Sequence, residues 1–189
     1  MTTMADPLVQ HHEFGEPWTI DDLKDLPDDA VDRYEIYDGS LVVTPHAGMF
    51  HGGVTNRLHR VMTRQAPDDV LVSQSVGVSR KRTSYFIPDL FVVPETAYGE
   101  GDAFHPSDVV LVVEVLSPSN ARYDLVVKRD EYAIAGIPVY WIVDPKKQAL
   151  TVLELAADGT YREAAVVEPG QVWRTGKPFP LAFDLAEIF

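Results

Sequence analysis

One glutamate stands inside a run of apolar residues, where a charged side chain is not expected. Glu114 lies in the segment 109–116, which otherwise contains valine and leucine only. Because a buried carboxylate is costly unless its charge is stabilised or it takes up a proton, something must lie against it. We expect a cation, a metal ion or a hydrated cavity beside Glu114. A structural salt bridge is the alternative that this residue alone leaves open.

A second carboxylate opens another apolar strand. Asp89 follows Pro88 and precedes the apolar segment 90–93. A Pro-Asp dipeptide alone is more typical of a turn, but on a strand adjacent to Glu114 the two carboxylates converge. Converging carboxylates repel each other unless a cation lies between them. Magnesium is bound by one or two carboxylates together with waters and phosphate oxygens, so this pair suits metal-dependent hydrolysis of a phosphodiester.

Lys128 and His51 are the candidate polar side chains on helices. Lys128 shares a face of a predicted helix with Asp124 and Tyr132, because the three residues are spaced four apart. Its ammonium can stabilise charge on a phosphate or orient a water, and an exposed ion pair with Asp124 is the alternative. His51 begins another predicted helix. An imidazole there suits phosphate contact or accessory acid–base chemistry, the alternative being a polar surface residue.

Hydrophobic periodicity and turn residues indicate the elements that must position these side chains. Helical spacing predicts helices over 50–65 and 121–135, the second ended by Gly136. Because the second helix joins two apolar strands, the three elements form a crossover unit with parallel strands. We therefore predict an α/β fold in which helices flank a mixed β-sheet. The predicted strands are 34–37 and 41–44 around an Asp38-Gly39 turn, then 70–79, 88–93, 109–116, 139–143, 150–155 and 161–167.

Length and composition favour one globular domain. The chain has 189 residues, 46% of them hydrophobic, so two domains would each be small for independent folding. We predict a flexible N-terminal arm over 1–16 and a single domain over 17–189. The domain begins with a short helix that starts within 18–23, is capped by Thr19 and ends at Pro27. The segment 94–108 is expected to be a loop.

The absence of certain sequence features excludes several classes of protein. There is no cysteine, which excludes disulfides and thiolate metal sites. There is no apolar run of membrane-spanning length and no secretory signal pattern, so we expect a cytoplasmic protein without a membrane partner. Walker A, GxGxxG, GxSxG and HExxH motifs are also absent, which argues against P-loop, dinucleotide, serine-hydrolase and zinc-protease chemistry.

The net charge argues against simple attraction to nucleic acid. Sixteen Lys and Arg residues stand against 29 Asp and Glu residues, a formal charge of −13. Proteins that bind phosphates through bulk charge are usually basic. A local basic run, Arg80-Lys81-Arg82, can contact a phosphate backbone, although a solvated turn is the commoner case.

Taken together, these motifs resemble the Uma-type family of restriction endonuclease-like proteins, within the PD-(D/E)XK nuclease superfamily. The resemblance extends from about residue 20 to the C-terminus and is most specific over 109–145. It rests on Pro88-Asp89, the segment 114–119, Asp124, Lys128, Tyr132, Gly136, the segment 139–145, Tyr34-Glu35-Ile36, Asp38-Gly39 and His51.

The resemblance implies a restriction endonuclease-like core and a metal site. It implies Mg²⁺ or Mn²⁺ held by Asp89 and Glu114, with the Val115 carbonyl as a further ligand. Glu35 matches an early glutamate of the family, although an exposed hairpin acid is the alternative. The superfamily lysine usually stands two residues after the acidic strand residue, where this chain has Leu116. The matching residue here is Lys128 on the following helix.

Three functions follow as hypotheses. The first is a magnesium-dependent endonuclease that hydrolyses phosphodiester bonds, in DNA. The second is a catalytically inactive nuclease-fold protein, a homodimeric binding or regulatory module in which Glu114 and Lys128 form a structural ion pair. The third is a purely structural role, in which Tyr140, Trp141 and Trp173 form an oligomer contact. A place in the core is the simpler explanation for these aromatic residues. Carboxylates converging with Lys128 at an open cleft would support the enzyme, and a Glu114–Lys128 pair sealed from solvent would overturn it.

Overall fold

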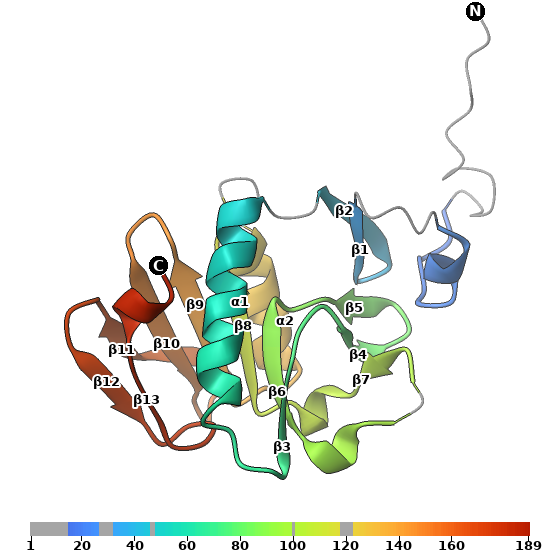
Figure 1. Ribbon diagram of the computed structural model, residues 1–189. Coiled ribbons are helices and arrows are strands. Elements are labelled where there is room, and N and C mark those ends of the chain that lie inside the picture. The colour runs from blue at the N-terminus through green and yellow to red at the C-terminus, as the bar shows by residue number, and fades with distance from the viewer. Residues whose placement is uncertain (1–14, 27–31, 46–47, 100, 118–122) are drawn as a thin grey trace, which may run out of the picture.

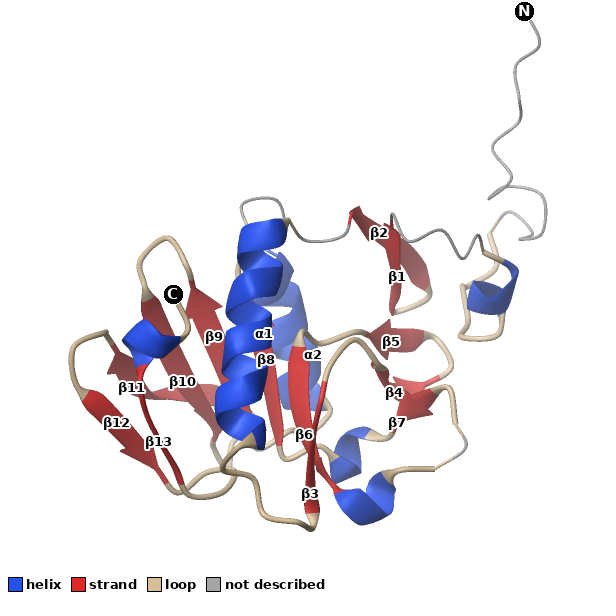
Figure 2. Ribbon diagram, viewed as in Figure 1, coloured by secondary structure: helices blue, strands red, loops and turns tan. Residues whose placement is uncertain are grey.

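The computed structural model describes residues 15–26, 32–45, 48–99, 101–117 and 123–189. The strands form three sheets, against which the helices pack (Figure 1, Figure 2). Almost all of the predicted N-terminal arm lies outside the described residues. None of the described helices is long and apolar enough to cross a membrane.

The largest sheet has six strands and holds the central apolar segments. Its order is β11-β10-β9-β8-β6-β3. β8 and β9 are parallel and the other neighbouring pairs are antiparallel, so the sheet is mixed and the predicted crossover is confirmed. Its strands are β3 (Val70–Ser73), β6 (Leu90–Pro94), β8 (Leu111–Val115), β9 (Val139–Asp144), β10 (Ala149–Leu155) and β11 (Tyr161–Val167).

Helices cover both faces of this sheet, α1 in front and α2 behind in the view of Figure 1. α1 (Met49–Thr63) matches the predicted helix 50–65. The second predicted helix begins as a π-helical segment, η5 (Tyr123–Lys128), and continues as α2 (Arg129–Ile134). It ends before Gly136, whose positive φ of 77° is the left-handed conformation expected of a helix-terminating glycine.

The alternation of side chains along β8 explains the two cores. Val113 belongs to the cluster that includes Leu58 of α1, whereas Val112 belongs to the cluster that includes Tyr132 of α2. Successive strand residues point to opposite faces, so Glu114 lies on the same face as Val112. The glutamate therefore points toward the helix that carries Lys128.

A second, five-stranded sheet stands beside the first, in the order β2-β1-β5-β4-β7. Its predicted hairpin is confirmed, with Asp38 and Gly39 at φ values of 44° and 80°, as a tight primed turn requires. The strands are β1 (Asp32–Tyr37), β2 (Ser40–Pro45), β4 (Gly77–Lys81), β5 (Ser84–Phe86) and β7 (Ala103–Phe104).

The single strand predicted over 70–79 is wrong. This segment contributes β3 to the six-stranded sheet and β4 to the five-stranded sheet. Ser75 lies between the two strands with a φ of 57°, a left-handed conformation that an extended strand does not contain. The chain therefore changes direction at Ser75 and crosses from one sheet to the other.

The short helix predicted to start within 18–23 and to end at Pro27 is only one 3-10 turn in this segment, η2 (Asp22–Asp25), and the residue before it, Asp21, makes no side-chain cap. The Thr19 N–H and hydroxyl both donate hydrogen bonds to the Asp22 carboxylate, each at 2.7 Å. Thr19 is therefore a donor here and does not act as the predicted side-chain cap. The expected loop 94–108 contains β7 and two further 3-10 turns, η3 (Glu95–Ala97) and η4 (Pro106–Asp108).

The C-terminal residues form a two-stranded sheet that was not predicted. β12 (Val172–Thr175) and β13 (Leu181–Asp184) pair antiparallel and lead into the 3-10 turn η6 (Leu185–Glu187). Trp173 of β12 packs edge-on against the buried Trp141, with ring centroids 5.4 Å apart. The core role of the aromatic residues is therefore confirmed.

Candidate functional site

The pairing of β6 with β8 brings the two predicted carboxylates to the same place. Leu90 pairs with Val113 in the antiparallel register. Asp89 is one residue before Leu90, and Glu114 is one residue after Val113, so the register continues to Asp89 opposite Glu114. The Asp89 carboxylate also accepts a hydrogen bond from the Val115 N–H at 2.8 Å. Both acidic side chains are buried.

Asp89 is held as an anion by donors from three elements. His51 Nε2 lies 3.0 Å from Oδ2, and Arg33 Nη1 lies 3.0 Å from Oδ1. Burial raises the pKa of Asp89, but the hydrogen bond and charge of His51, the Val115 N–H and the charge of Arg33 outweigh it. The net effect lowers the pKa of Asp89 to about 2. The His51 ring is largely buried against the aspartate, so the surface-residue alternative is wrong, and its role with phosphate or as an acid–base group stays a prediction.

Glu114 is held by two donors from the helix behind the sheet. Lys128 Nζ lies 3.0 Å from Oε1, and the Tyr132 hydroxyl donates to the same oxygen at 2.6 Å. The two donors are one helical turn apart and therefore face the sheet together. Burial and the charges of Glu114 and Glu35 raise the pKa of Tyr132 well above its ordinary value, so the phenol stays a neutral donor.

Glu35 reaches the same cluster from the five-stranded sheet. Its Oε1 lies 3.0 Å from Lys128 Nζ and accepts from the Ile87 N–H at 2.7 Å. The exposed-hairpin alternative is therefore wrong, because Glu35 is buried. Arg33 stands two residues earlier on β1, on the same face, which explains why one strand contributes an acid and a base to the site.

The cluster behaves as one electrostatic unit. Burial lowers the pKa of Arg33, but the charge and hydrogen bond of Asp89 and the charges of Glu114 and Glu35 raise it by more. All three carboxylates therefore act on one guanidinium. With Lys128 and the His51 ring counted as well, the three acids face two fixed cations and one imidazole.

A cavity of about 650 Å³ opens beside His51. Of the cluster residues, only His51 lines it. The Asp89 side chain is 5% exposed and is thus as buried as the Glu114–Lys128 pair, with exposures of 2% and 5%. The open cleft expected of an enzyme therefore meets the cluster at His51 alone, and the buried Glu114–Lys128 pair expected of an inactive module is present.

The donor chemistry of the cluster fits magnesium. Carboxylate and carbonyl oxygens are its preferred ligands, and one or two carboxylates suffice when water and phosphate complete the shell. Among the described residues, no three acidic or histidine side chains are arranged to hold a metal ion by themselves. Both oxygens of Asp89 already accept hydrogen bonds, so a metal ion there competes with Arg33 and His51.

Comparison with protein-family models identifies the family of the chain. A model of the Uma2 family, described as "Putative restriction endonuclease", matches residues 20–187, which include every residue of the cluster. The chain belongs to the Uma2 family. No curated protein matches the chain.

The fold of this Uma2 family member is similar to that of a solved structure. That structure is described as "a putative nuclease belonging to DUF820 from Anabaena variabilis ATCC 29413". The two chains are 17% identical and superpose with a TM-score of 0.66, covering 92% of this chain and 98% of the other. The likeness establishes a shared fold.

Sequence reasoning missed Arg33 as a member of the Uma2 site. Arg33 stands two residues before Glu35, and strand alternation places both on one face, so the spacing carried a usable signal. The partnership of Tyr132 with Glu114 was also missed, although the shared helix face with Lys128 was noted. The side chain of Asp124 lies outside the described part of the chain.

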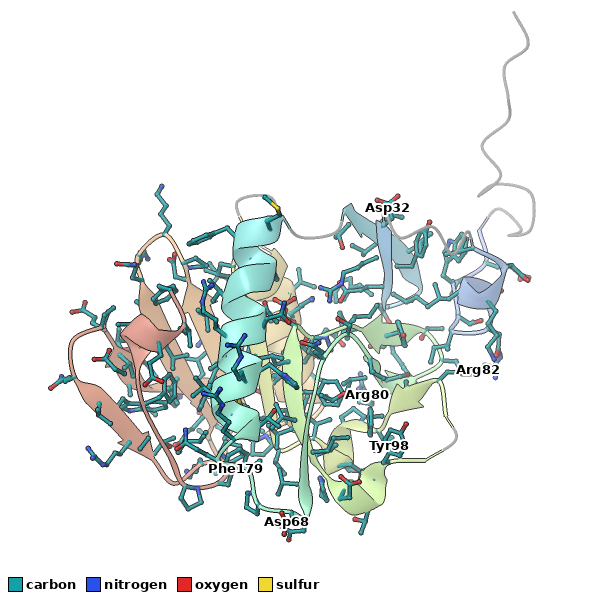
Figure 3. All side chains as sticks on the ribbon, viewed as in Figure 1. Asp32, Asp68, Arg80, Arg82, Tyr98 and Phe179 are labelled. Atoms are coloured by element: carbon teal, nitrogen blue, oxygen red, sulfur yellow. The ribbon has the colours of Figure 1, made fainter. Side chains whose placement is uncertain are left out.

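The basic run at 80–82 does not form a free phosphate-binding surface. Lys81 pairs with Asp38 at 2.7 Å, and Arg82 pairs with Asp21 of the N-terminal segment. Figure 3 shows Arg82 at the outer margin of the five-stranded sheet, below η2 and far from α1. All three residues of the run are exposed, as the commoner interpretation of such a run, a solvated turn, expects.

Proposed function

We propose that this protein is a magnesium-dependent endonuclease that hydrolyses phosphodiester bonds in DNA. One observation carries the proposal: the Leu90–Val113 pair of β6 and β8 brings Asp89, one residue before Leu90, and Glu114, one residue after Val113, to the same end of the two strands, and Lys128 contacts Glu114 there. Family membership and a related fold described as a "putative nuclease" support it. Manganese is expected to substitute for magnesium, because it accepts the same oxygen ligands.

The residues divide into metal-binding and charge-stabilising groups. Asp89 and Glu114 would hold the metal ion, with the Val115 carbonyl as the further ligand predicted from the family resemblance. A bound metal ion supplies an activated water at neutral pH and polarises the phosphate. Lys128 stabilises negative charge that develops on the phosphate, and Glu35 keeps the ammonium in position through its own contact at 3.0 Å.

His51 and Tyr132 complete the arrangement. His51 lies at the boundary between the cavity and Asp89, so its ring is placed to contact a phosphate or exchange a proton with the leaving oxygen. Tyr132 orients Glu114 through a 2.6 Å hydrogen bond and does not need to ionise. These roles assign one chemical task to each side chain that the fold brings together.

A second candidate function is a catalytically inactive homodimeric module in the cytoplasm. The observation that favours it is the sealed Glu114–Lys128 pair, which satisfies both charges without a ligand. The net charge of −13 also favours a partner other than nucleic acid. A nuclease fold does not by itself guarantee nuclease activity, so the choice between the two functions depends on the chemistry of the site.

Cleavage assays separate the two functions. We would incubate the full chain with plasmid DNA and single-stranded DNA in Mg²⁺, in Mn²⁺ and in EDTA, and compare wild type with Asp89→Asn. The nuclease predicts cleavage of at least one of the two DNA forms in either metal, and loss of that cleavage in EDTA and in the variant. The exposed Asp68, at the far end of the molecule in Figure 3, provides the control Asp68→Asn, which should cleave normally. Absence of metal-dependent cleavage by folded wild type would contradict the nuclease and favour the inactive module.

A further inference from the structure

The cavity beside His51 has walls suited to a flat organic group. Phe50, Leu116 and Pro145 form apolar walls, and its volume of about 650 Å³ lies within the range of small-molecule sites. It lies between the N-terminal end of α1 and the segment that follows β9, which come together at the same end of the six-stranded sheet (Figure 1). It is therefore continuous with the proposed catalytic cluster through His51.

Phe50 is an aromatic side chain without a core role. It is 62% exposed although it belongs to the predicted apolar face of α1, whose residues Val54 and Leu58 are fully buried. An exposed aromatic ring at the wall of a cavity offers a stacking surface, and nucleobases stack on such rings irrespective of sequence. Only an unpaired base can present its face, because a base inside a duplex is covered on both sides by its neighbours.

The cavity is lined by one lysine, Lys146, and by one carboxylate, Asp144. In the described part of the chain no carboxylate forms an ion pair with the Lys146 ammonium. The Asp144 carboxylate is satisfied by the N–H groups of Lys146 and Lys147 and by the ammonium of Lys147 at 3.6 Å. The first turn of α1 contains no acidic residue, so its free N–H groups add a partial positive charge.

We propose that this cavity binds an unpaired nucleotide adjacent to the cleaved bond, with its base on Phe50 and its phosphate near Lys146. The substrate is therefore single-stranded DNA rather than intact duplex. The inference rests on the proposed function, because His51 links the cavity to the nuclease site. It also explains how a protein with a net charge of −13 binds an anion: stacking supplies binding free energy that does not depend on bulk charge.

Binding without cleavage tests the inference directly. We would measure fluorescence anisotropy of a labelled oligothymidylate with the full chain in EDTA, and repeat it with a duplex of mixed sequence. Wild type should bind the single strand more tightly than the duplex. Phe50→Ala should weaken single-strand binding by roughly 5- to 100-fold, the range expected for loss of one base–aromatic stack. Phe50→Trp should restore it.

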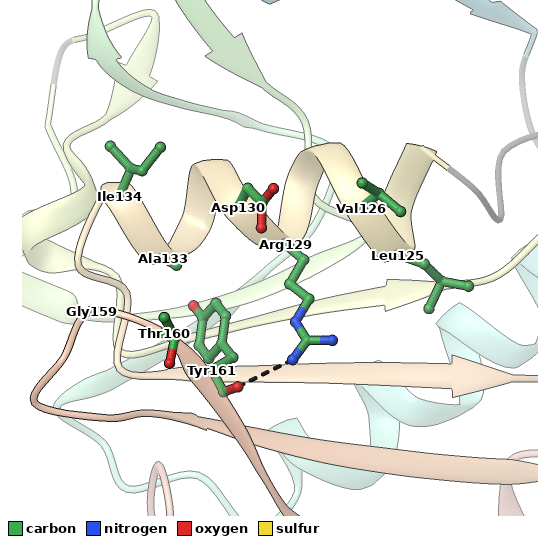
Figure 4. Close-up of a pocket in the computed structure, with 9 residues that line it drawn as sticks. All are labelled: Leu125, Val126, Arg129, Asp130, Ala133, Ile134, Gly159, Thr160 and Tyr161. Atoms are coloured by element: carbon green, nitrogen blue, oxygen red, sulfur yellow. Dashed lines mark hydrogen bonds between the residues drawn. The ribbon is translucent and has the colours of Figure 1, made fainter.

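Matched variants control for exposure and for charge. Ile134→Ala removes an apolar side chain that is also 62% exposed but lines a different pocket, between α2 and β11 (Figure 4). It should bind normally. Lys146→Ala should weaken binding and flatten its salt dependence. Lys177→Ala makes the same change in net charge on the β12–β13 side, where Lys177 pairs with Glu154. This variant should bind the oligonucleotide as wild type does.

Failure of the inference differs from failure of the proposed function. Absence of single-strand binding, or binding that Phe50→Ala leaves unchanged, would overturn the cavity assignment even if the protein cleaves DNA. Binding that depends on Phe50 without any cleavage would support the cavity and overturn the nuclease. Because EDTA prevents metal binding, the anisotropy result does not depend on catalysis.

Discussion

Lys128 Nζ lies 3.0 Å from Glu114 Oε1, and both side chains are buried. The same ammonium lies 3.0 Å from Glu35 Oε1, so one cation joins a glutamate of the six-stranded sheet to a glutamate of the five-stranded sheet. The contact therefore has a structural consequence as well as the proposed catalytic one. Variants of Lys128 should therefore change the stability of the fold as well as the chemistry.

Removal of the Lys128 charge should destabilise the protein. Lys128→Met leaves Glu35 and Glu114 buried without their shared cation, and breaking a buried ion pair typically costs about 3–5 kcal/mol. Urea unfolding measures the change. Lys177→Met breaks the exposed pair with Glu154 and should cost less than about 1 kcal/mol. Equal losses in the two variants would show that Lys128 is not paired as described.

The Tyr132 hydroxyl should contribute stability through Glu114. Tyr132→Phe removes the 2.6 Å hydrogen bond but keeps the ring, so we expect a loss of about 1.5–3 kcal/mol, the range for a hydrogen bond to a charged group. Thermal or urea unfolding provides the measurement. Tyr98→Phe, at a tyrosine that is largely exposed, serves as the control and should change stability little. No loss in Tyr132→Phe would contradict the assigned hydrogen bond.

Asp89 should make the protein acid-sensitive. Its pKa falls from 3.8 to about 2 on folding, so its carboxylate stabilises the folded state fully above about pH 4 and progressively less as the pH falls toward 2. One pKa unit corresponds to about 1.4 kcal/mol, so wild type should lose on the order of 2 kcal/mol more than Asp89→Asn over this interval. Unfolding free energies at several pH values test the difference. Parallel pH profiles for the two proteins would contradict it, and Asp68→Asn should follow wild type.

Arg33 should compete with the metal ion for Asp89. The guanidinium donates to Oδ1 at 3.0 Å, so Arg33→Ala frees this oxygen and removes a repulsive charge. We expect Mn²⁺ affinity, measured by titration calorimetry without nucleic acid, to increase on the order of tenfold. Arg57→Ala, which removes a guanidinium bound to the Ile188 carbonyl, should leave the affinity unchanged. Unchanged or weaker Mn²⁺ binding in Arg33→Ala would place the metal ion elsewhere.

The strands that carry the acids were predictable from local sequence. A charged residue in the apolar segment 109–116 required a partner, and helical spacing placed Lys128 and Tyr132 on one face. The crossover rule then placed that helix against the sheet. These inferences use only neighbouring residues and general handedness, which is why they succeeded.

Contacts between residues far apart in the sequence could not be predicted from local patterns. The partnership of Arg33 with Asp89 joins residues 56 positions apart and depends on how two sheets meet. The division of 70–79 into β3 and β4 depends on one left-handed residue, Ser75, whose side chain does not demand that conformation. The β12–β13 pair depends on packing of Trp173 against Trp141, a contact that no spacing reveals.

The most direct test of the nuclease is the cleavage rate of Glu114→Gln. Lys128 keeps its contact with Glu35 in this variant, so the fold should persist while one metal-binding carboxylate is lost. Single-turnover cleavage of single-stranded DNA in Mg²⁺ should fall at least about a hundredfold, whereas Glu163→Gln, at an exposed position of β11, should cleave at the wild-type rate. Cleavage by folded Glu114→Gln at the wild-type rate would contradict the assignment of this cluster as the catalytic centre.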